Sequence, residues 1–529
     1  MDAECGAGRR CLGTRCVNPP PDGGVIVALG EPCARSIECE TGLCLPAEHG
    51  GLCASACADS ATCGGGYVCV PFPLDADGDG TAERVGTACA PADPGGDFLG
   101  SGCTDGTTCE SHTCVDGECD VACDDDTDCL PGQRCTTLSL PGATDSSFVG
   151  CGDPPPAGSL ETLDVDLGSV HAATGSPTRR ISFSAPRDAI SLTLIATQPG
   201  GSEPLPLTFL DVYNPVNARL FDFYSMAMYE DQPIRWLPID SEESIAMLVP
   251  NSTTDRVSFL PGRHGVTFAL LERTAGDSAT SDLNLTARFK RAPAGVSGGT
   301  LDLNIFLVGV GLTEATAPSS TRLQGALDEM RSIFGTAGVA LGTVNYIQIT
   351  GTAATTLSVI DTSDGPTSEM AQLFRLSEGR TNNAIDVFLV RGISAGAGER
   401  GGIALGIAGG IPGPPAVHGT MHSGVVVSYD VMVVGTDPHV IAQIMTHEIS
   451  HYLGLYHNTE GGRACGPGEI PTMTVSCSPF GGGDVLADTA YGDGTNLMYY
   501  ALGGRDGRTY NVDLSAGQAF VMSRSALLR

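Results

Sequence analysis

The side chains most able to do chemistry in this chain occur together in one run of eleven residues, H-E-I-S-H-Y-L-G-L-Y-H. His447 and His451 are four residues apart, so on a helix both imidazoles project from one face toward a single metal ion. Gly454 can end that helix in a left-handed conformation and turn the chain back, which brings in His457 as a third nitrogen ligand. Three protein ligands and one open position are typical of catalytic zinc, and Glu448 is placed to act as general base toward a zinc-activated water.

A helix is expected at this motif on independent grounds. Asp437 and Pro438 supply an N-cap side chain and a proline at the first helical position. Only 10 histidines occur among the 529 residues, so a chance match to the whole motif would be rare. Apolar residues follow the cap at helical spacing, namely Val440, Ile441, Ile444, Met445 and Leu453.

A second segment, N-L-M-Y-Y, lies downstream of the third histidine. It resembles the Met-turn of the metzincin zinc peptidases, in which a methionine packs beneath the zinc ligands, and Met498 is the matching residue. The resemblance implies that Tyr500 approaches the metal or the reacting oxyanion. A methionine that only fills the core is the alternative. Its occurrence together with the extended zinc motif favours the Met-turn.

Within the metzincins, the chain resembles the pappalysin/cytophagalysin group. The zinc motif is similar almost throughout, and Asp484 and Asp488 match a D-x-x-x-D-T segment of that group. The run L-S-A-G-Q near the C-terminus resembles the start of the group's last helix. Two positions differ: Tyr499 stands where the group has Asp, and Ser450 stands where small residues such as Gly are common. The resemblance covers residues 297–529.

The pattern of that region suits an α/β scaffold. Strands are predicted at residues 301–308, 344–349 and 385–390, and a helix is predicted at 319–335. Such alternation implies right-handed crossovers and a mostly parallel sheet.

A Gly-rich run, residues 401–424, precedes a short predicted strand at 424–429 and then the zinc motif. A simple loop is one interpretation. In metzincins this stretch carries the edge strand and the rim of the cleft, where an extended peptide can add as a further strand. His418 and His422 fall within it, and because the later motif is already complete we interpret them as rim residues rather than ligands.

Cysteines dominate the N-terminal region, where 19 of the 21 precede residue 152. The region is poor in large apolar residues, so disulfides must hold it together, with a connectivity that stays open. Zinc-binding cysteine clusters are the alternative, but they require C-x-x-C pairs combined with histidines, and this combination does not occur in the region. Two sets of eight repeat at similar spacing after a partial set of three: Cys5, Cys11 and Cys16; Cys33, Cys39, Cys44, Cys53, Cys57, Cys63, Cys69 and Cys89; Cys103, Cys109, Cys114, Cys119, Cys123, Cys129, Cys135 and Cys151.

The odd number of N-terminal cysteines indicates a partner lost upstream; a thiolate that blocks the catalytic zinc in a latent form is the alternative. A disulfide framework requires an oxidising compartment, so we expect a secreted or extracytoplasmic protein. The first residues show neither the basic nor the apolar part of an export signal, so we expect that the signal has been removed. A lipid anchor in the missing segment is compatible with this. No apolar run reaches transmembrane length.

The net charge of −33 and pI near 4.4 argue against nucleic-acid and anionic-membrane partners. The expected partner is a protein or peptide substrate, and the N-terminal modules could bind an extracellular surface or matrix. Calcium is a second expected ion, because Asp75, Asp77 and Asp79 match the start of a calcium loop. Gly86 stands where a bidentate Glu is expected, so a solvated acidic loop is the alternative.

We therefore expect a multidomain chain. Residues 1–155 would form tandem disulfide modules. Residues 156–296 show short alternating segments separated by turn residues and predict an antiparallel, jelly-roll-like β-sandwich, which loosely resembles accessory domains of secreted bacterial peptidases. Residues 297–529 would form the α/β metzincin catalytic domain.

Two functions are consistent with this organisation. The first is a secreted zinc endopeptidase, and the second is an extracellular adhesion or matrix-binding protein with an inactive peptidase-like domain. The retained general base, three ligands and Met-turn favour the first.

We predict a disulfide between Cys465 and Cys477, the two cysteines outside the N-terminal region. Their segment is rich in Gly and Pro and has little means of packing itself. Closing so short a loop contributes roughly 3 kcal/mol in the loop-entropy model, and the bond would hold the chain between His457 and the aspartates Asp484 and Asp488, where calcium could also bind. Non-reducing peptide mapping should detect this cross-link, whereas a bond from either cysteine to the first 151 residues would refute it.

Overall fold

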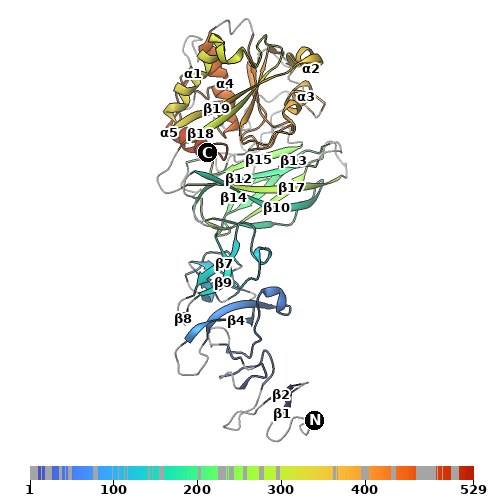
Figure 1. Ribbon diagram of the computed structural model, residues 1–529, viewed down its shortest axis with the longest axis vertical. Helices are drawn as coiled ribbons and strands as arrows, with labels where there is room; N and C mark the ends of the chain where they lie inside the picture. The colour runs from blue at the N-terminus through green and yellow to red at the C-terminus, as the bar shows by residue number, and fades with distance from the viewer. Residues whose placement is uncertain are drawn as a thin grey trace.

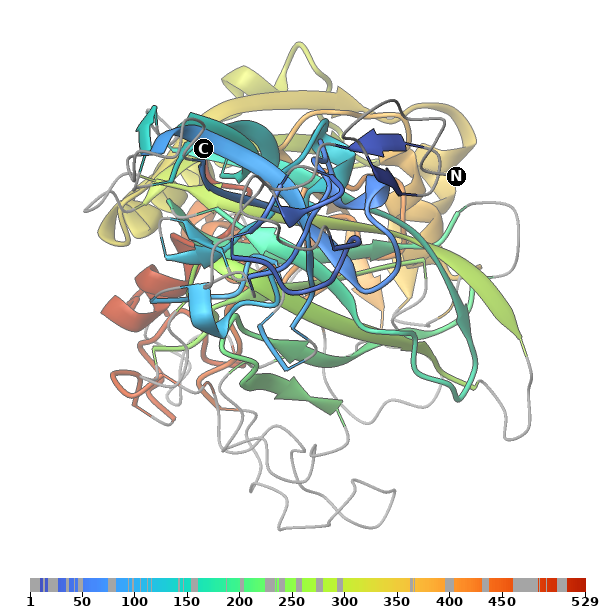
Figure 2. The same cartoon turned by 90° about the horizontal axis from the view of Figure 1, so that it is seen from below.

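The structure is a computed structural model in which most residues from Arg10 to Arg529 are described. Besides residues 1–9, the ranges of five or more residues outside this description are 18–26, 46–50, 75–81, 154–159, 224–233, 237–242, 254–258, 273–278, 293–297, 395–403, 431–436, 460–483 and 502–510. The chain is multidomain and built largely from β-sheets. Its parts follow one another along the long axis, with the disulfide-rich region at one end and the helices at the other (Figure 1). Figure 2 looks along that axis from the N-terminal end.

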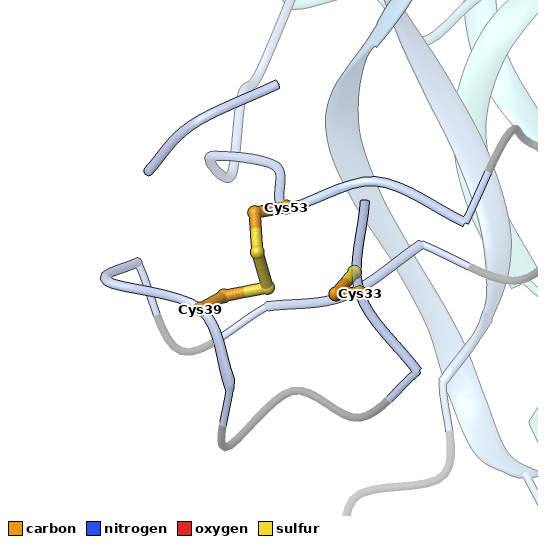
Figure 3. Close-up of side chains that lie close together, drawn as sticks. All are labelled: Cys33, Cys39 and Cys53. Atoms are coloured by element: carbon orange, nitrogen blue, oxygen red, sulfur yellow. A yellow bond between two sulfur atoms is a disulfide. The ribbon is translucent and has the colours of Figure 1, made fainter. Parts of the chain in front are cut away.

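The N-terminal region is held by eight disulfides among its described residues. Each set of eight cysteines has the same pairing: first to third, second to fourth, fifth to seventh and sixth to eighth. Each predicted eight-cysteine module therefore consists of two four-cysteine units with crossed disulfides. Figure 3 shows one such place, where the Cys39–Cys53 bond lies beside Cys33. These cysteines are engaged with each other, as an oxidising, non-cytoplasmic environment allows.

The strands of this region are short and enclose only small apolar clusters. One cluster is centred on Val70, Phe72 and Ala88, and a second on Val121 with Cys123 and Cys151. Cores this small explain why the region depends on covalent links. The strands are β1 (Arg10–Leu12), β2 (Arg15–Val17), β3 (Tyr67–Leu74), β4 (Ala82–Pro91), β5 (Cys114–Val115), β6 (Glu118–Cys119), β7 (Arg134–Ser139), β8 (Ala143–Asp145) and β9 (Ser147–Gly152).

The middle region consists of two four-stranded antiparallel sheets that share one hydrophobic core. One sheet has the order β10-β17-β12-β15 and the other β11-β16-β13-β14. Alternation along the strands fills this core. Five strands coincide with the alternating segments 181–184, 190–195, 246–249, 266–271 and 283–289 of the sequence, whereas β10, β13 and β14 do not. The strands are β10 (Glu161–Ala173), β11 (Ile181–Ala185), β12 (Ala189–Thr197), β13 (Leu207–Tyr213), β14 (Arg219–Asp222), β15 (Ser244–Val249), β16 (Gly262–Leu270) and β17 (Thr280–Arg291).

The C-terminal region contains a five-stranded sheet of order β19-β18-β21-β24-β23, parallel except for the edge strand β23. Side chains alternate across it. Leu303, Ile305 and Leu307 pack toward α1 and α4, whereas Phe306 and Val308 join a cluster with α3 on the other face. The strands are β18 (Gly299–Leu307), β19 (Val339–Gln348), β20 (Val359–Asp361), β21 (Ile385–Val390), β22 (Gly392–Ser394), β23 (Gly406–Ala408) and β24 (Val425–Ser428); the helices are α1 (Thr321–Thr336), α2 (Gly351–Thr356), α3 (Glu369–Phe374), α4 (Pro438–Tyr452) and α5 (Ala516–Met522).

The middle and C-terminal regions share contacts that reach the zinc motif. Leu248 of β15 belongs to the hydrophobic core of the C-terminal region, and a Cβ placed on Gly454 would lie 3.1 Å from its Cδ2 atom. Glu243 forms an ion pair with Arg375 and accepts a hydrogen bond of 2.9 Å from the backbone N–H of Met421. The two regions therefore pack as neighbours with side chains interlocked. Among the described residues, no helix has both the length and the apolar character needed to cross a membrane.

Lys290 of β17 is fully buried at the same junction and donates to the carbonyls of Ser523 and Gly298 at 2.8 and 3.2 Å. Burial, together with the nearby Arg524 guanidinium, lowers the pKa of Lys290 from 10.5 to about 7. Between these pH values the unfolded chain keeps the proton and the folded chain does not. The unfolded state thus binds more protons, and the free energy of unfolding rises with pH.

We expect this contribution of Lys290 to be present above pH 10 and to be lost as the pH falls toward 7. Lys290→Met removes the titration, so the wild type should gain more stability than the variant over this range. Chemical denaturation at several pH values measures the difference. Parallel stability curves for the two proteins would show that the Lys290 pKa is not lowered by folding.

Candidate active site

The helix α4 begins and runs as the sequence predicts. Asp437 is its N-cap and accepts from the backbone N–H of His439 at 3.0 Å, and Pro438 occupies the first turn. One face of α4, with Ile441, Met445 and Ile449, is buried against the sheet and α1. The helix therefore holds His447 and His451 on a rigid, well-packed element.

The three histidines of the motif converge. The Nε2 atoms of His447, His451 and His457 lie 3.1 Å from one another in each pair, so all three point at one position. Gly454 has a φ of 108°, a conformation that favours glycine, and it makes the turn that brings His457 back. The three predicted ligands thus lie together, and zinc binding by them stays a prediction.

Backbone carbonyls orient two of these imidazoles. His447 Nδ1 lies 2.7 Å from the Leu497 carbonyl, and His451 Nδ1 lies 2.7 Å from the Leu455 carbonyl. A carbonyl can only accept, so each Nδ1 carries the proton and each Nε2 keeps its lone pair. Burial, with the two other imidazoles, lowers the pKa of His451 well below its ordinary value. The donor set is thus neutral imidazole nitrogen, which fits a zinc ion.

Residues 496–500 reach the first histidine of the motif through the Leu497 carbonyl, and the predicted Met-turn role of Met498 stays a prediction. Met498 is fully buried, its N–H donates to Asn496 Oδ1 at 2.9 Å, and its carbonyl accepts from Asn458. The side-chain amides of Asn496 and Gln518 bond to each other in both directions, at 2.9 and 3.0 Å. The last helix, α5, therefore fixes the turn whose Leu497 carbonyl orients His447.

Glu448 faces a cavity of about 560 Å³ beside the histidines. The residue is 9% exposed, and burial raises the pKa of Glu448 to about 8, against the opposing effect of a backbone hydrogen bond at Ala408. The edge strand β23 covers it: a Cβ on Gly406 would lie 2.5 Å from Glu448 Cγ, so only glycine allows this approach. Tyr500 also lines the cavity and is 48% exposed.

The chain between β23 and β24 contacts the end of α4, where the Tyr452 hydroxyl donates to the Pro414 carbonyl, and the two histidines in it are not among the described residues that line the cavity. His418 forms a buried ion pair with Asp386 at 2.6 Å, and His422 Nδ1 bonds to the Gly409 carbonyl. Burial alone would lower the pKa of His418, but the Asp386 carboxylate outweighs it and raises that pKa. Neither imidazole belongs to the group of three converging histidines, and that they are not ligands stays a prediction. The prediction that they form the cleft rim is wrong, because each side chain is satisfied by polar partners inside the fold.

Two of the predicted calcium ligands, Asp484 and Asp488, accept hydrogen bonds from the start of α5 and from nearby backbone. Asp488 accepts from Ser515 Oγ and the Gly517 N–H at 3.1 and 2.7 Å, and thus supports the start of α5. Asp484 accepts from Leu486 N and Gln518 Nε2, each at 3.4 Å. Calcium at this pair stays a prediction.

The other calcium loop and the predicted C-terminal disulfide lie outside the described residues. These are Asp75, Asp77 and Asp79, and Cys465 and Cys477.

Comparisons with known proteins do not identify a family for this chain. No family model matches the chain, and no curated protein matches it. Among solved structures, metalloproteinase-II from Bacteroides fragilis matches at a TM-score of 0.23 and 11% identity, over 45% of this chain and 62% of that chain. The infectious bursal disease virus VP2 particle matches at 0.17 and 12% identity, over 30% and 38% of the two chains. This chain thus spans less than two thirds of either structure, and similarities this slight carry no argument about family.

Several residues that shape the site were not predicted. Gly406 belongs to a Gly-rich run and Gln443 lies inside the predicted helix, and both line the cavity. Gln518 belongs to the segment that resembles the start of the last helix. For Gln443, its position four residues before His447 was an available signal, because it places both side chains on one face of α4.

Proposed function

We propose that this chain is a secreted zinc endopeptidase of the metzincin class, similar to the pappalysin/cytophagalysin group. The observation that carries the proposal is the convergence of three imidazole nitrogens at 3.1 Å beside a buried glutamate in an open cavity. The eight disulfides support a location outside the cytoplasm. The fold of the C-terminal region, with a parallel sheet and the motif on a packed helix, is compatible with it.

His447, His451 and His457 would hold the zinc. When bound, zinc supplies a Lewis acid that polarises a carbonyl and lowers the pKa of water. The carbonyls of Leu497 and Leu455 keep two of the imidazoles in the tautomer that binds metal.

Glu448 would act as the general base and later as the general acid. It lines the cavity next to the converging histidines, where its carboxylate can accept a proton from water attacking the peptide carbonyl. It would then deliver that proton to the leaving amine. The Tyr500 hydroxyl, at the mouth of the cavity, could donate a hydrogen bond to the oxyanion that develops on the former carbonyl.

The substrate would be an extended segment of a protein or peptide. Strand β23 lies at one edge of its sheet, and its residues Gly406 and Ala408 line the cavity that contains Glu448. A peptide pairing with this edge would run along the cleft and present one backbone carbonyl to the histidines.

The test is zinc content measured together with proteolysis. The purified protein should contain about one zinc per chain and should hydrolyse a denatured protein in a reaction that a chelator abolishes and added zinc restores. Stoichiometric zinc without hydrolysis of any denatured substrate would favour the inactive, adhesive alternative. Hydrolysis that resists the chelator after the zinc is removed would contradict the mechanism.

A further inference from the structure

Gln443 combines two features that rarely occur together without a ligand. The residue is 3% exposed, and its buried Oε1 atom has no hydrogen-bond partner among the described residues. At the same time Gln443 lines the cavity that contains Glu448 and lies four residues before His447 on α4. A buried amide with an unused acceptor is destabilising, because it has lost its bonds to water without replacing them.

The surroundings of Gln443 would suit an apolar residue. Besides the histidines, Glu448 and two tyrosines, the cavity is lined by Ala404, Leu405, Ile411 and Ile444, so a leucine at position 443 would extend its apolar part. Gln518 is a useful contrast, since it is fully buried but bonds to Asn496 and Ser515 through both atoms of its amide. A polar residue that weakens the fold at a cleft is typically retained for binding.

We propose that Gln443 determines specificity by recognising a neutral substrate side chain that both donates and accepts hydrogen bonds, that is, a carboxamide or a hydroxyl. The proposal rests on the proposed peptidase function and names the side chain that enters the cavity next to the cleaved bond. A carboxamide can turn about its last bond and exchange its oxygen and nitrogen, so its best partner offers both a donor and an acceptor.

A charged side chain fits the cavity less well. A buried ammonium needs a paired carboxylate to offset its loss of hydration. Among the described lining residues the single carboxylate is Glu448, which the proposed reaction already uses. An aliphatic side chain would leave the Gln443 amide unpaired and is therefore disfavoured.

The experiment compares Gln443→Leu with the wild type, and Gln518→Leu serves as the matched control. We expect Gln443→Leu to raise the melting temperature by about 2–4 °C. Gln518→Leu should lower it, because Asn496 and Ser515 would lose their hydrogen bonds to the Gln518 amide. A peptide library with Gln, Ser, Leu or Lys beside the cleaved bond then measures kcat/KM. The wild type should prefer Gln and Ser over Leu by about tenfold to 100-fold, and Gln443→Leu should lose this preference.

Each result decides the proposal. A Gln443→Leu variant that melts at or below the wild-type temperature would show that the amide has a structural partner, and the proposal would fall. An unchanged cleavage profile in a stabilised variant would equally overturn it. A preference of the wild type for Lys would mean that charge is recognised instead. If the wild type binds zinc but cleaves no peptide, the proposed function itself fails, and this inference fails with it.

Discussion

Glu448→Ala should lower kcat by a factor on the order of 10² to 10⁴, the usual contribution of a positioned acid or base. The physical reason is that the carboxylate of Glu448 is the one acidic side chain among the described residues that line the cavity. Without it, the described lining of the cavity contains no other carboxylate to accept the proton of the attacking water or return it to the leaving amine. The measurement is steady-state hydrolysis of a peptide substrate by zinc-loaded protein.

The zinc content of the Glu448→Ala variant should remain that of the wild type, because Glu448 is not among the three converging ligands. The conservative variant Glu448→Gln keeps the size of the side chain but not its basicity, so it should be equally slow. This comparison separates proton transfer from packing against Gly406. Proteolysis at the wild-type rate by either zinc-loaded variant would refute the role of Glu448.

His451→Ala is the second change with a large expected effect. It should weaken zinc binding by more than about 100-fold, the upper range for loss of an outer-shell partner, because a direct ligand is removed. His451 is also the most constrained of the three, with its Nδ1 bonded to the Leu455 carbonyl and its ring buried. Competition with a metal-sensitive dye measures the affinity, and hydrolysis should fall in parallel.

His439 provides the matched control for this experiment. It lies on the same helix, its side chain is 53% exposed, and it pairs with Glu329 at 3.5 Å on the surface. His439→Ala should therefore bind zinc as the wild type does. Equal zinc affinity in His451→Ala and the wild type would mean that the converging histidines do not form the metal site.

Local features of the active-site helix could be predicted because they depend on neighbours in sequence. The cap at Asp437, the proline after it and the apolar spacing along α4 each act within one or two turns. The positions of β18, β21 and β24 were also close to prediction, since strands buried on both faces form continuous apolar runs. Helices α2 and α3 were missed, because six residues are too few to show a helical period.

The pairing of the cysteines, in contrast, could not be predicted from the sequence. Their spacing predicted repeated modules, but many connectivities satisfy the same spacing. The crossed pairing appears only when the short strands and bridges bring distant sulfurs together, for example Cys63 and Cys89 through β3 and β4.

By itself, the sequence determined the ligand types, their helical spacing, the glycine turn and the disulfide-rich character of the N-terminal region. Tertiary structure alone decided what surrounds those ligands. Gly406 covers Glu448, Leu248 of the middle region packs on Gly454, and Gln518 fixes the turn whose carbonyl orients His447. The reason is physical: ligand spacing follows the period of one helix, whereas the burial, tautomer and pKa of each ligand depend on groups contributed by strands and helices far away in the chain.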